Sequence, residues 1–140
     1  MFLLDTNVLS ERRKPKPHGA VVAWVDSVAQ QDLFLSAMTI AEIQTGVERT
    51  RERDPGKSSE IEAWLEQVLE TAQVLPMNAE VAREWARIMH KKPMSMAQDA
   101  WIAATAKHFR KIVVTRNLRD FAGFGVDTLD PFEDTRALNP

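Results

Sequence analysis

The sequence predicts an α/β fold with three α/β/α layers, in which a central parallel sheet of four to five strands is flanked by helices. Short apolar runs alternate with segments of helical periodicity along the whole chain. This alternation is typical of parallel sheets whose strands are joined by helices. No Asn-Gly pair or similar hairpin signal joins two of the apolar runs, which argues against antiparallel strand pairs.

The expected strands are short apolar runs. They cover residues 2–5, 33–37, 73–77 and 111–115, with a last edge strand within 125–132. Apolar residues at helical spacing predict helices over 6–11, 20–31, 39–51, 60–71, 79–90 and 96–109, and a helical turn over 117–121. We expect a basic loop at 12–19 and a polar turn at 52–59 because these stretches are rich in charge, proline and glycine.

Composition restricts the class of protein. A chain of 140 residues is expected to form one domain, 1–140, with an ordinary core. A formal net charge of −2 is not that of a typical basic nucleic-acid-binding domain. The absence of cysteine excludes disulfides, thiol nucleophiles and cysteine-bound zinc. No apolar run is long enough for a signal sequence or a membrane span, so we expect a cytoplasmic protein.

Asp5 is the first candidate functional residue because it directly follows the apolar run FLL. A buried charge is costly unless it is paired, hydrogen-bonded or bound to a metal ion. Parallel sheets of this class bind ligands at the carboxyl ends of their strands, which is where Asp5 is expected. Thr6 or Asn7 can cap the helix that follows.

Glu42 can reach the same edge, but it also has a structural interpretation. With Thr39 it forms a Thr-x-x-Glu capping box, in which the carboxylate binds the helix backbone. Glu42 also stands beside the apolar stripe of its helix, so its side chain can project towards Asp5. Both interpretations remain open.

Asp99 presents the same choice. Ser95 and Gln98 form a second capping box, and an acid in the first helical turn is favoured by the helix dipole. The box is complete without Asp99, which shares a helix face with inward-packing residues such as Ile102 and Ala103. An acid on such a face is less easily explained as an ordinary solvent-exposed side chain.

A fourth group follows the strand at 111–115. Thr115 and Asn117 come directly after it, and Asp120 lies three residues beyond Asn117. Asn117 can act as a helix cap and Asp120 as a first-turn acid, or either can reach the rim occupied by Asp5.

Asp5, Glu42 and Asp99 together indicate a metal site. Neighbouring carboxylates raise one another's pKa, so a charged cluster needs a cation. Oxygen ligands without cysteine or paired histidine suit Mg²⁺, with Mn²⁺ also possible, better than Zn²⁺. Such a site activates water for phosphodiester hydrolysis.

Four segments also carry a family resemblance: LLDTNVLSE, LSAMTIAEIQTGV, QDAWIAATAKHF and VVTRNLRDF…GV. In order and spacing they resemble the PIN-domain ribonucleases, above all the VapC-type toxins of bacterial type II toxin–antitoxin pairs and the related FitB group. The resemblance implies a PIN-like fold and a Mg²⁺- or Mn²⁺-dependent endoribonuclease that is inhibited by a small antitoxin and assembles as a dimer. On this pattern Asp5, Glu42 and Asp99 are the core acids, with Asp5 and Asp99 as direct metal ligands.

Supporting positions and one departure come with the resemblance. Thr6, Ser36 and Thr115 match hydroxyl-bearing positions that support the site. Many relatives have an acid where this chain has Asn117, so a single Mg²⁺ is expected rather than two ions. Asp120 is the residue that can compensate.

Basic residues near Asp5 are candidates for RNA contact. Arg12, Arg13 and Lys14 lie in the basic loop and Arg116 precedes Asn117. The loop residues can bind phosphates without sequence preference, or they can form an ordinary solvated surface. Arg116 can bind phosphate or the antitoxin.

Two other classes of function compete with a toxin nuclease. A PIN-like module with little nuclease activity can act on DNA through an antitoxin complex, and Asn117 favours this alternative. A phosphoacceptor or phosphatase with Asp5 as nucleophile would need a second acid beside Asp5, or a lysine after a late strand where the chain has Arg116.

Overall fold

The computed structural model of the protein describes residues 1–133. Its five strands form one parallel sheet with the order β3-β2-β1-β4-β5. The strands are β1 (Phe2–Leu4), β2 (Leu33–Ser36), β3 (Gln73–Leu75), β4 (Ile112–Val114) and β5 (Thr128–Leu129). The predicted fold class is confirmed, and the last edge strand is shorter than the stretch in which it was expected.

Seven α-helices and two short 3₁₀ turns connect the strands within residues 1–133. The helices are α1 (Thr6–Glu11), α2 (Gly19–Ser27), α3 (Ala37–Arg51), α4 (Pro55–Thr71), α5 (Ala79–Met89), α6 (Ala97–Phe109) and α7 (Leu118–Phe121). The 3₁₀ turns are η1 (Gln30–Asp32) and η2 (Met94–Met96). None of the helices in this part of the chain is long and apolar enough to cross a membrane.

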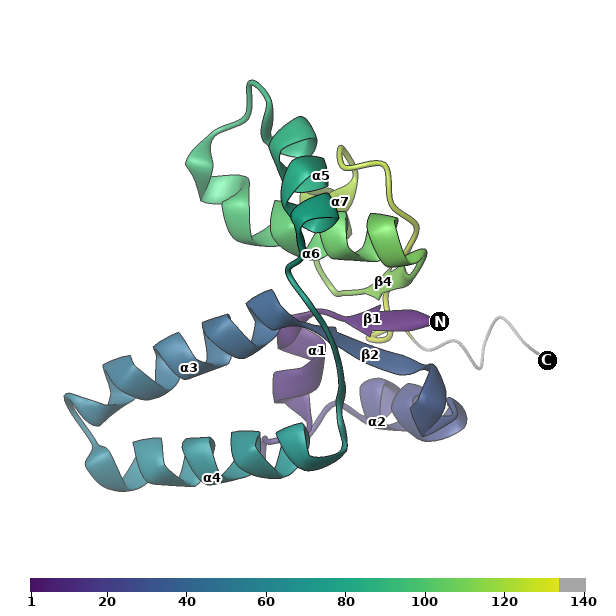
Figure 1. Ribbon diagram of the computed structural model, residues 1–140. Helices are drawn as coiled ribbons and strands as arrows, with labels where there is room; N and C mark the ends of the chain where they lie inside the picture. Colours follow the sequence, from purple (N-terminus) through teal and green to yellow (C-terminus); the bar gives the residue numbers. More distant parts are fainter. Residues whose placement is uncertain (134–140) are drawn as a thin grey trace.

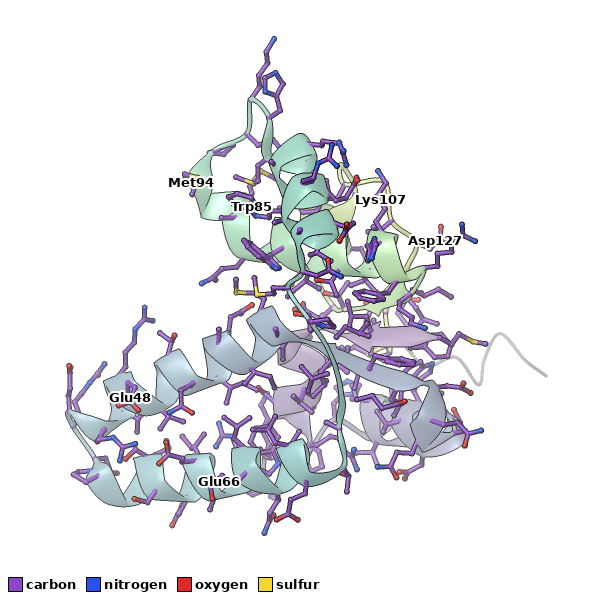
Figure 2. All side chains as sticks on the ribbon, in the orientation of Figure 1. Glu48, Glu66, Trp85, Met94, Lys107 and Asp127 are labelled. Carbon is purple, nitrogen blue, oxygen red and sulfur yellow. The ribbon has the colours of Figure 1, made fainter. Side chains whose placement is uncertain are left out.

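The sheet separates two apolar cores (Figure 1). Alternate residues of a strand face opposite sides, so Leu3 and Val113 pack with α5, α6 and α7. Leu4 and Val114 pack on the other face with α1, α2 and α4. Side chains fill both spaces in Figure 2, which gives the three predicted layers.

The turn expected at 52–59 is largely helical, which corrects that prediction. Asp54 is the N-cap of α4 and accepts a hydrogen bond from the Lys57 amide at 3.1 Å. Pro55 is the first helical residue, where its missing amide hydrogen is not needed. The helices α3 and α4 form a hairpin that extends from the sheet, bridged by Arg51 and Glu62 at 3.1 Å (Figure 1).

Connectivity decides which residues meet at the carboxyl edge of the sheet. Because all strands are parallel, Asp5, Ser36 and Thr115 leave β1, β2 and β4 at the same edge. The helix α6 ends close to the start of β4, so its first turn, with Asp99, lies towards that carboxyl edge.

Candidate metal centre

Asp5 occupies a closed environment at the end of β1. Only 4% of the residue is exposed, and both carboxylate oxygens accept hydrogen bonds. Oδ1 accepts from the Thr6 amide at 2.8 Å, and Oδ2 accepts from the Thr115 hydroxyl at 2.8 Å. Asp5 is therefore itself the N-cap of α1, which corrects the expectation that Thr6 or Asn7 would cap this helix.

Opposing effects act on the pKa of Asp5. Burial is the largest and raises the pKa, while the hydrogen bonds from Thr115 and Thr6 lower it. The negative charge of Asp120 adds a smaller upward effect. The balance lies above the ordinary value, so the Asp5 carboxylate gains stability from any cation placed beside it.

Thr115 links β4 to the site. It is fully buried, donates to Asp5 and accepts a hydrogen bond from the Asn117 amide at 3.0 Å. The Asn117 side chain is exposed at the N-cap of α7 and makes no capping bond. Asp120 is exposed in the first turn of α7, near enough for its charge to raise the pKa of both Asp5 and Asp99.

The start of α3 differs from the capping box predicted from the sequence. The N-cap is Ser36, not Thr39, and its Oγ accepts from the Thr39 amide at 3.2 Å. The Thr39 hydroxyl instead accepts from the Thr6 hydroxyl at 3.2 Å. These contacts join α1 to α3 and leave Glu42 without the backbone role of a capping box.

Glu42 has an unsatisfied oxygen in the site. Within residues 1–133 its Oε1 is buried and has no hydrogen-bond partner. Burial first, then the charges of Asp5 and Asp99, raise the pKa of Glu42 to about 7, against a lowering effect of Thr6. A buried acceptor without a donor is unfavourable unless a cation or a water fills the space.

Asp99 projects from the first turn of α6. The capping box predicted from Ser95 and Gln98 is wrong, because the helix begins after η2 with Met96 as an N-cap that makes no side-chain bond. Burial first, then the charges of Asp5 and Asp120, raise the pKa of Asp99 to about 6. Ile102 and Ala103 are fully buried on this helix, as its predicted inward face required.

The three acids suit a hard divalent cation by their chemistry. They offer only carboxylate oxygens, they repel one another, and one buried oxygen has no partner among residues 1–133. No three acidic or histidine side chains in the described part of the chain are gathered closely enough to hold a metal ion as they stand. Asp5, Glu42 and Asp99 are thus close enough for their charges to interact but are not drawn together to ligand distance.

The basic residues predicted to contact RNA lie in different surroundings. Lys14 pairs with Glu11 at 2.8 Å, while Arg13 is exposed. Arg12 lines a hollow of about 110 Å³ between α1, β2 and the end of α4. The Arg116 guanidinium lies over the ring of Phe132, 4.6 Å from its centre.

Two residues that organise these basic groups were missed from the sequence. Glu11 is 6% exposed and accepts from Lys14 and from the His18 amide at 2.9 Å, which holds its pKa below the usual value and folds the basic loop. Phe132 contacts Arg116 and His18. The apolar Val8 and Leu9 just before Glu11 were a signal for its burial, but no sequence signal placed Phe132.

The chain belongs to the PIN domain family, whose profile matches residues 2–125. It is 38% identical to the toxin FitB of Neisseria gonorrhoeae over 142 aligned residues, which cover 96% of this chain and 100% of that protein. It is 34% identical to the VapC ribonuclease Y4jK of Sinorhizobium fredii, with 95% and 99% of the two chains covered. The solved structure of FitAB bound to an IR36 DNA fragment superposes with a TM-score of 0.82 at 37% identity, covering 95% of this chain and 96% of that one.

Proposed function

We propose that this protein is a metal-dependent endoribonuclease and the toxin of a type II toxin–antitoxin pair. The observation that carries the proposal is Glu42 Oε1, a buried oxygen with no hydrogen-bond partner within residues 1–133. Burial first, and then the charges of Asp5 and Asp99, raise the pKa of this carboxyl group to about 7. Family membership supports the same activity, since similar chains are named as a toxin and as a ribonuclease.

We propose Asp5 and Asp99 as direct ligands of one divalent cation, Mg²⁺ or Mn²⁺, with Glu42 beside them. When bound, the cation supplies Lewis-acid activation of a water and stabilises negative charge on a phosphoryl group. Asn117 brings no charge, so a second tightly held ion is not proposed. Asp120 contributes negative charge at the rim of the site.

Residues of this chain hold the reacting groups. Thr115 and the Thr6 amide fix the Asp5 carboxylate, so its orientation is set before substrate arrives. Glu42 Oε1 is free to accept a hydrogen bond from the attacking water and orient it towards phosphorus. Ser36 supports Glu42 indirectly by fixing the first turn of α3.

The test is RNA cleavage by the purified protein in Mg²⁺, followed by mapping of 5′ ends. Asp5→Asn should abolish cleavage without unfolding the protein, and EDTA should do the same to the wild type. Asp127→Asn is a matched control, because Asp127 is an exposed acid that precedes β5 at the opposite edge of the sheet (Figure 2). Undiminished cleavage in EDTA, or by Asp5→Asn, would refute the proposal.

A second candidate is a PIN module with weak nuclease activity that acts on DNA through its antitoxin. The uncharged Asn117 favours it, and a similar protein pair has been solved bound to DNA. Cation binding without cleavage of any cellular RNA would support this alternative over the nuclease.

The remaining expectations are proposals of the same kind. We propose that residues 1–140 form a single cytoplasmic PIN domain that assembles as a homodimer and with a small antitoxin. Co-purification with the product of a small adjacent reading frame, followed by measurement of the mass of the complex, tests the assembly.

A further inference from the structure

Arg116 is a cation at the edge of the proposed metal centre. It follows Thr115, whose hydroxyl binds Asp5, and precedes Asn117. Its side chain is exposed and makes no ion pair or hydrogen bond with residues 1–133. Four of the other basic side chains, Lys14, Arg51, Arg87 and Lys107, are paired with acids.

The Arg116 guanidinium is nevertheless held in place. It lies over the ring of Phe132 at 4.6 Å from the centre. His18 packs edge-on against the same ring, with ring centres 5.2 Å apart and an interplanar angle of 63°. The ring is also partly buried against the core that contains Leu4 and Val8, so Phe132 is a fixed support rather than a mobile surface group.

The sheet explains why Phe132 reaches Arg116. The strand β5 runs parallel to β4, and the Thr115 amide donates to the Leu129 carbonyl at 2.9 Å. The chain leaving β5 therefore emerges at the same edge as Arg116. Asp130 then turns it, accepting a hydrogen bond from the Phe132 amide at 2.8 Å, and the ring comes to lie under the guanidinium.

We propose that Arg116 binds a phosphate of the RNA chain next to the phosphate that is cleaved, and that Phe132 is the positioning residue that presents it. The inference rests on the proposed nuclease function. Asp5, Glu42, Asp99 and Asp120 create a negative field that repels the RNA backbone, so a cation fixed at the rim gives the substrate a point of attachment. Arginine suits this task because it stacks on aromatic rings and still presents its donors to phosphate.

The first experiment measures RNA binding without cleavage. Asp5→Asn protein is titrated against a fluorescein-labelled single-stranded RNA of mixed sequence at several salt concentrations. Arg116→Gln should weaken binding about fivefold and lower the slope of log K against log salt by about 0.7, the value for one phosphate contact on a single strand. Arg53→Gln, which removes an exposed charge from the α3–α4 turn, should change the binding much less.

The second experiment isolates the ring. Phe132→Leu should weaken RNA binding about two- to fivefold, the range of a cation–aromatic contact, and in the cleaving protein it should raise KM while leaving kcat nearly unchanged. Phe132→Tyr retains the aromatic face, so its RNA affinity and its KM should be those of the protein with Phe132. Phe109→Leu, at the end of α6, controls for the general cost of losing a phenyl ring.

The double variant decides whether Phe132 acts through Arg116. Arg116→Gln with Phe132→Leu should bind RNA no more weakly than Arg116→Gln alone. Additive losses would overturn the proposal, because the ring would then contact RNA itself. Wild-type affinity in Phe132→Leu would overturn it as well.

Failure of this inference is distinguishable from failure of the nuclease proposal. If the wild type does not cleave RNA but binding depends on Arg116 and Phe132 as described, the phosphate contact stands and the nuclease proposal fails. If the wild type cleaves RNA and Arg116→Gln changes neither affinity nor KM, the phosphate contact is wrong and the nuclease proposal stands.

Discussion

Asp5 combines a structural role with a proposed chemical one. Its Oδ1 caps α1, while Oδ2 is held by Thr115, which arrives from the other end of the sequence. Burial raises its pKa and these donors lower it, so the carboxylate is kept in a fixed orientation at an electrostatic cost. Such a cost is expected where a group is organised for binding rather than for stability alone.

Thr115→Val should impair both the site and the fold. The substitution keeps the shape of the side chain but removes the donor to Asp5 and the acceptor for the Asn117 amide. A hydrogen bond to a charged group contributes about 1.5–3 kcal/mol, so we expect a loss of this size in urea denaturation and at least a tenfold loss of RNA cleavage. Thr105→Val is the control, because Thr105 is equally buried and its hydroxyl donates to the Trp101 carbonyl of its own helix, away from Asp5. Equal loss of cleavage in both variants would contradict the role of Thr115.

Glu42→Gln should make the metal-free protein more stable above neutral pH. The pKa of Glu42 in the folded state is raised from 4.5 to about 7, so its contribution to stability is present below pH 4.5 and is lost as pH rises to about 7. The amide has no charge to lose. Allowing for solvent screening of this partly exposed group, we expect a gain of about 1 kcal/mol at pH 8.

Thermal unfolding in EDTA at pH 5 and pH 8 measures the Glu42 effect. The wild type should be less stable at pH 8 relative to Glu42→Gln, and the difference should vanish at low pH. Glu62→Gln is the control, since hydrogen bonds from Gln44 and Arg51 lower the pKa of Glu62 and loss of its charge should not stabilise the protein. If the difference in stability between the wild type and Glu42→Gln did not change with pH, the raised pKa of Glu42 would be contradicted.

At the scale of elements, the N-cap of α3 should matter for activity and not only for stability. Ser36→Ala removes the acceptor for the Thr39 amide at the start of the helix that carries Glu42. Loss of such a cap costs about 1 kcal/mol, and the freed first turn should also reduce RNA cleavage severalfold. Asp54→Ala removes the equivalent bond at α4, away from the site, and should lower stability alone in urea denaturation. Loss of cleavage in Asp54→Ala as well would show that the effect is general.

The elements themselves were largely predictable, whereas their caps were not. The strands FLL and IVV are apolar over their whole length, and LFLS is apolar up to its last residue, because both faces of this sheet are covered. That pattern is visible in the sequence. The capping boxes at Thr39 and Ser95 failed because α3 begins directly after β2, and α6 begins after a 3₁₀ turn. Ser36 and Thr39 both carry a hydroxyl oxygen that can cap a helix, so the position at which the helix begins decides which one is used.

The acids of the candidate site were predictable for a related reason. Asp5 follows a strand and Asp99 shares a face with apolar residues, so their environment was set by local pattern and topology. The support for Arg116 was not predictable, because Phe132 meets it only through the pairing of β4 and β5 and the turn after β5. Contacts of this kind depend on how the elements are assembled.

At the scale of the whole molecule, the three acids of the candidate site come from different layers. Asp5 follows β1 in the sheet, and Glu42 lies on α3, the first helix of the α3–α4 hairpin. Asp99 lies in the first turn of α6, in the opposite layer (Figure 1). Their mutual repulsion opposes the packing of these parts in the absence of a cation. A bound cation would convert this repulsion into a link between the layers.

Mg²⁺ should therefore stabilise the whole fold. A ligand that binds only the folded state at about 100 times its Kd adds about 2.7 kcal/mol, which corresponds to a rise in Tm of roughly 5–10 °C for a domain of this size. Thermal unfolding in MgCl₂, compared with NaCl of equal ionic strength, measures the effect. Asp99→Asn should remove most of the rise, because it deletes a proposed ligand, while Asp127→Asn at the opposite edge should retain it. An equal rise in Asp99→Asn and wild type would mean that Mg²⁺ binds elsewhere and that the three layers are not joined through these acids.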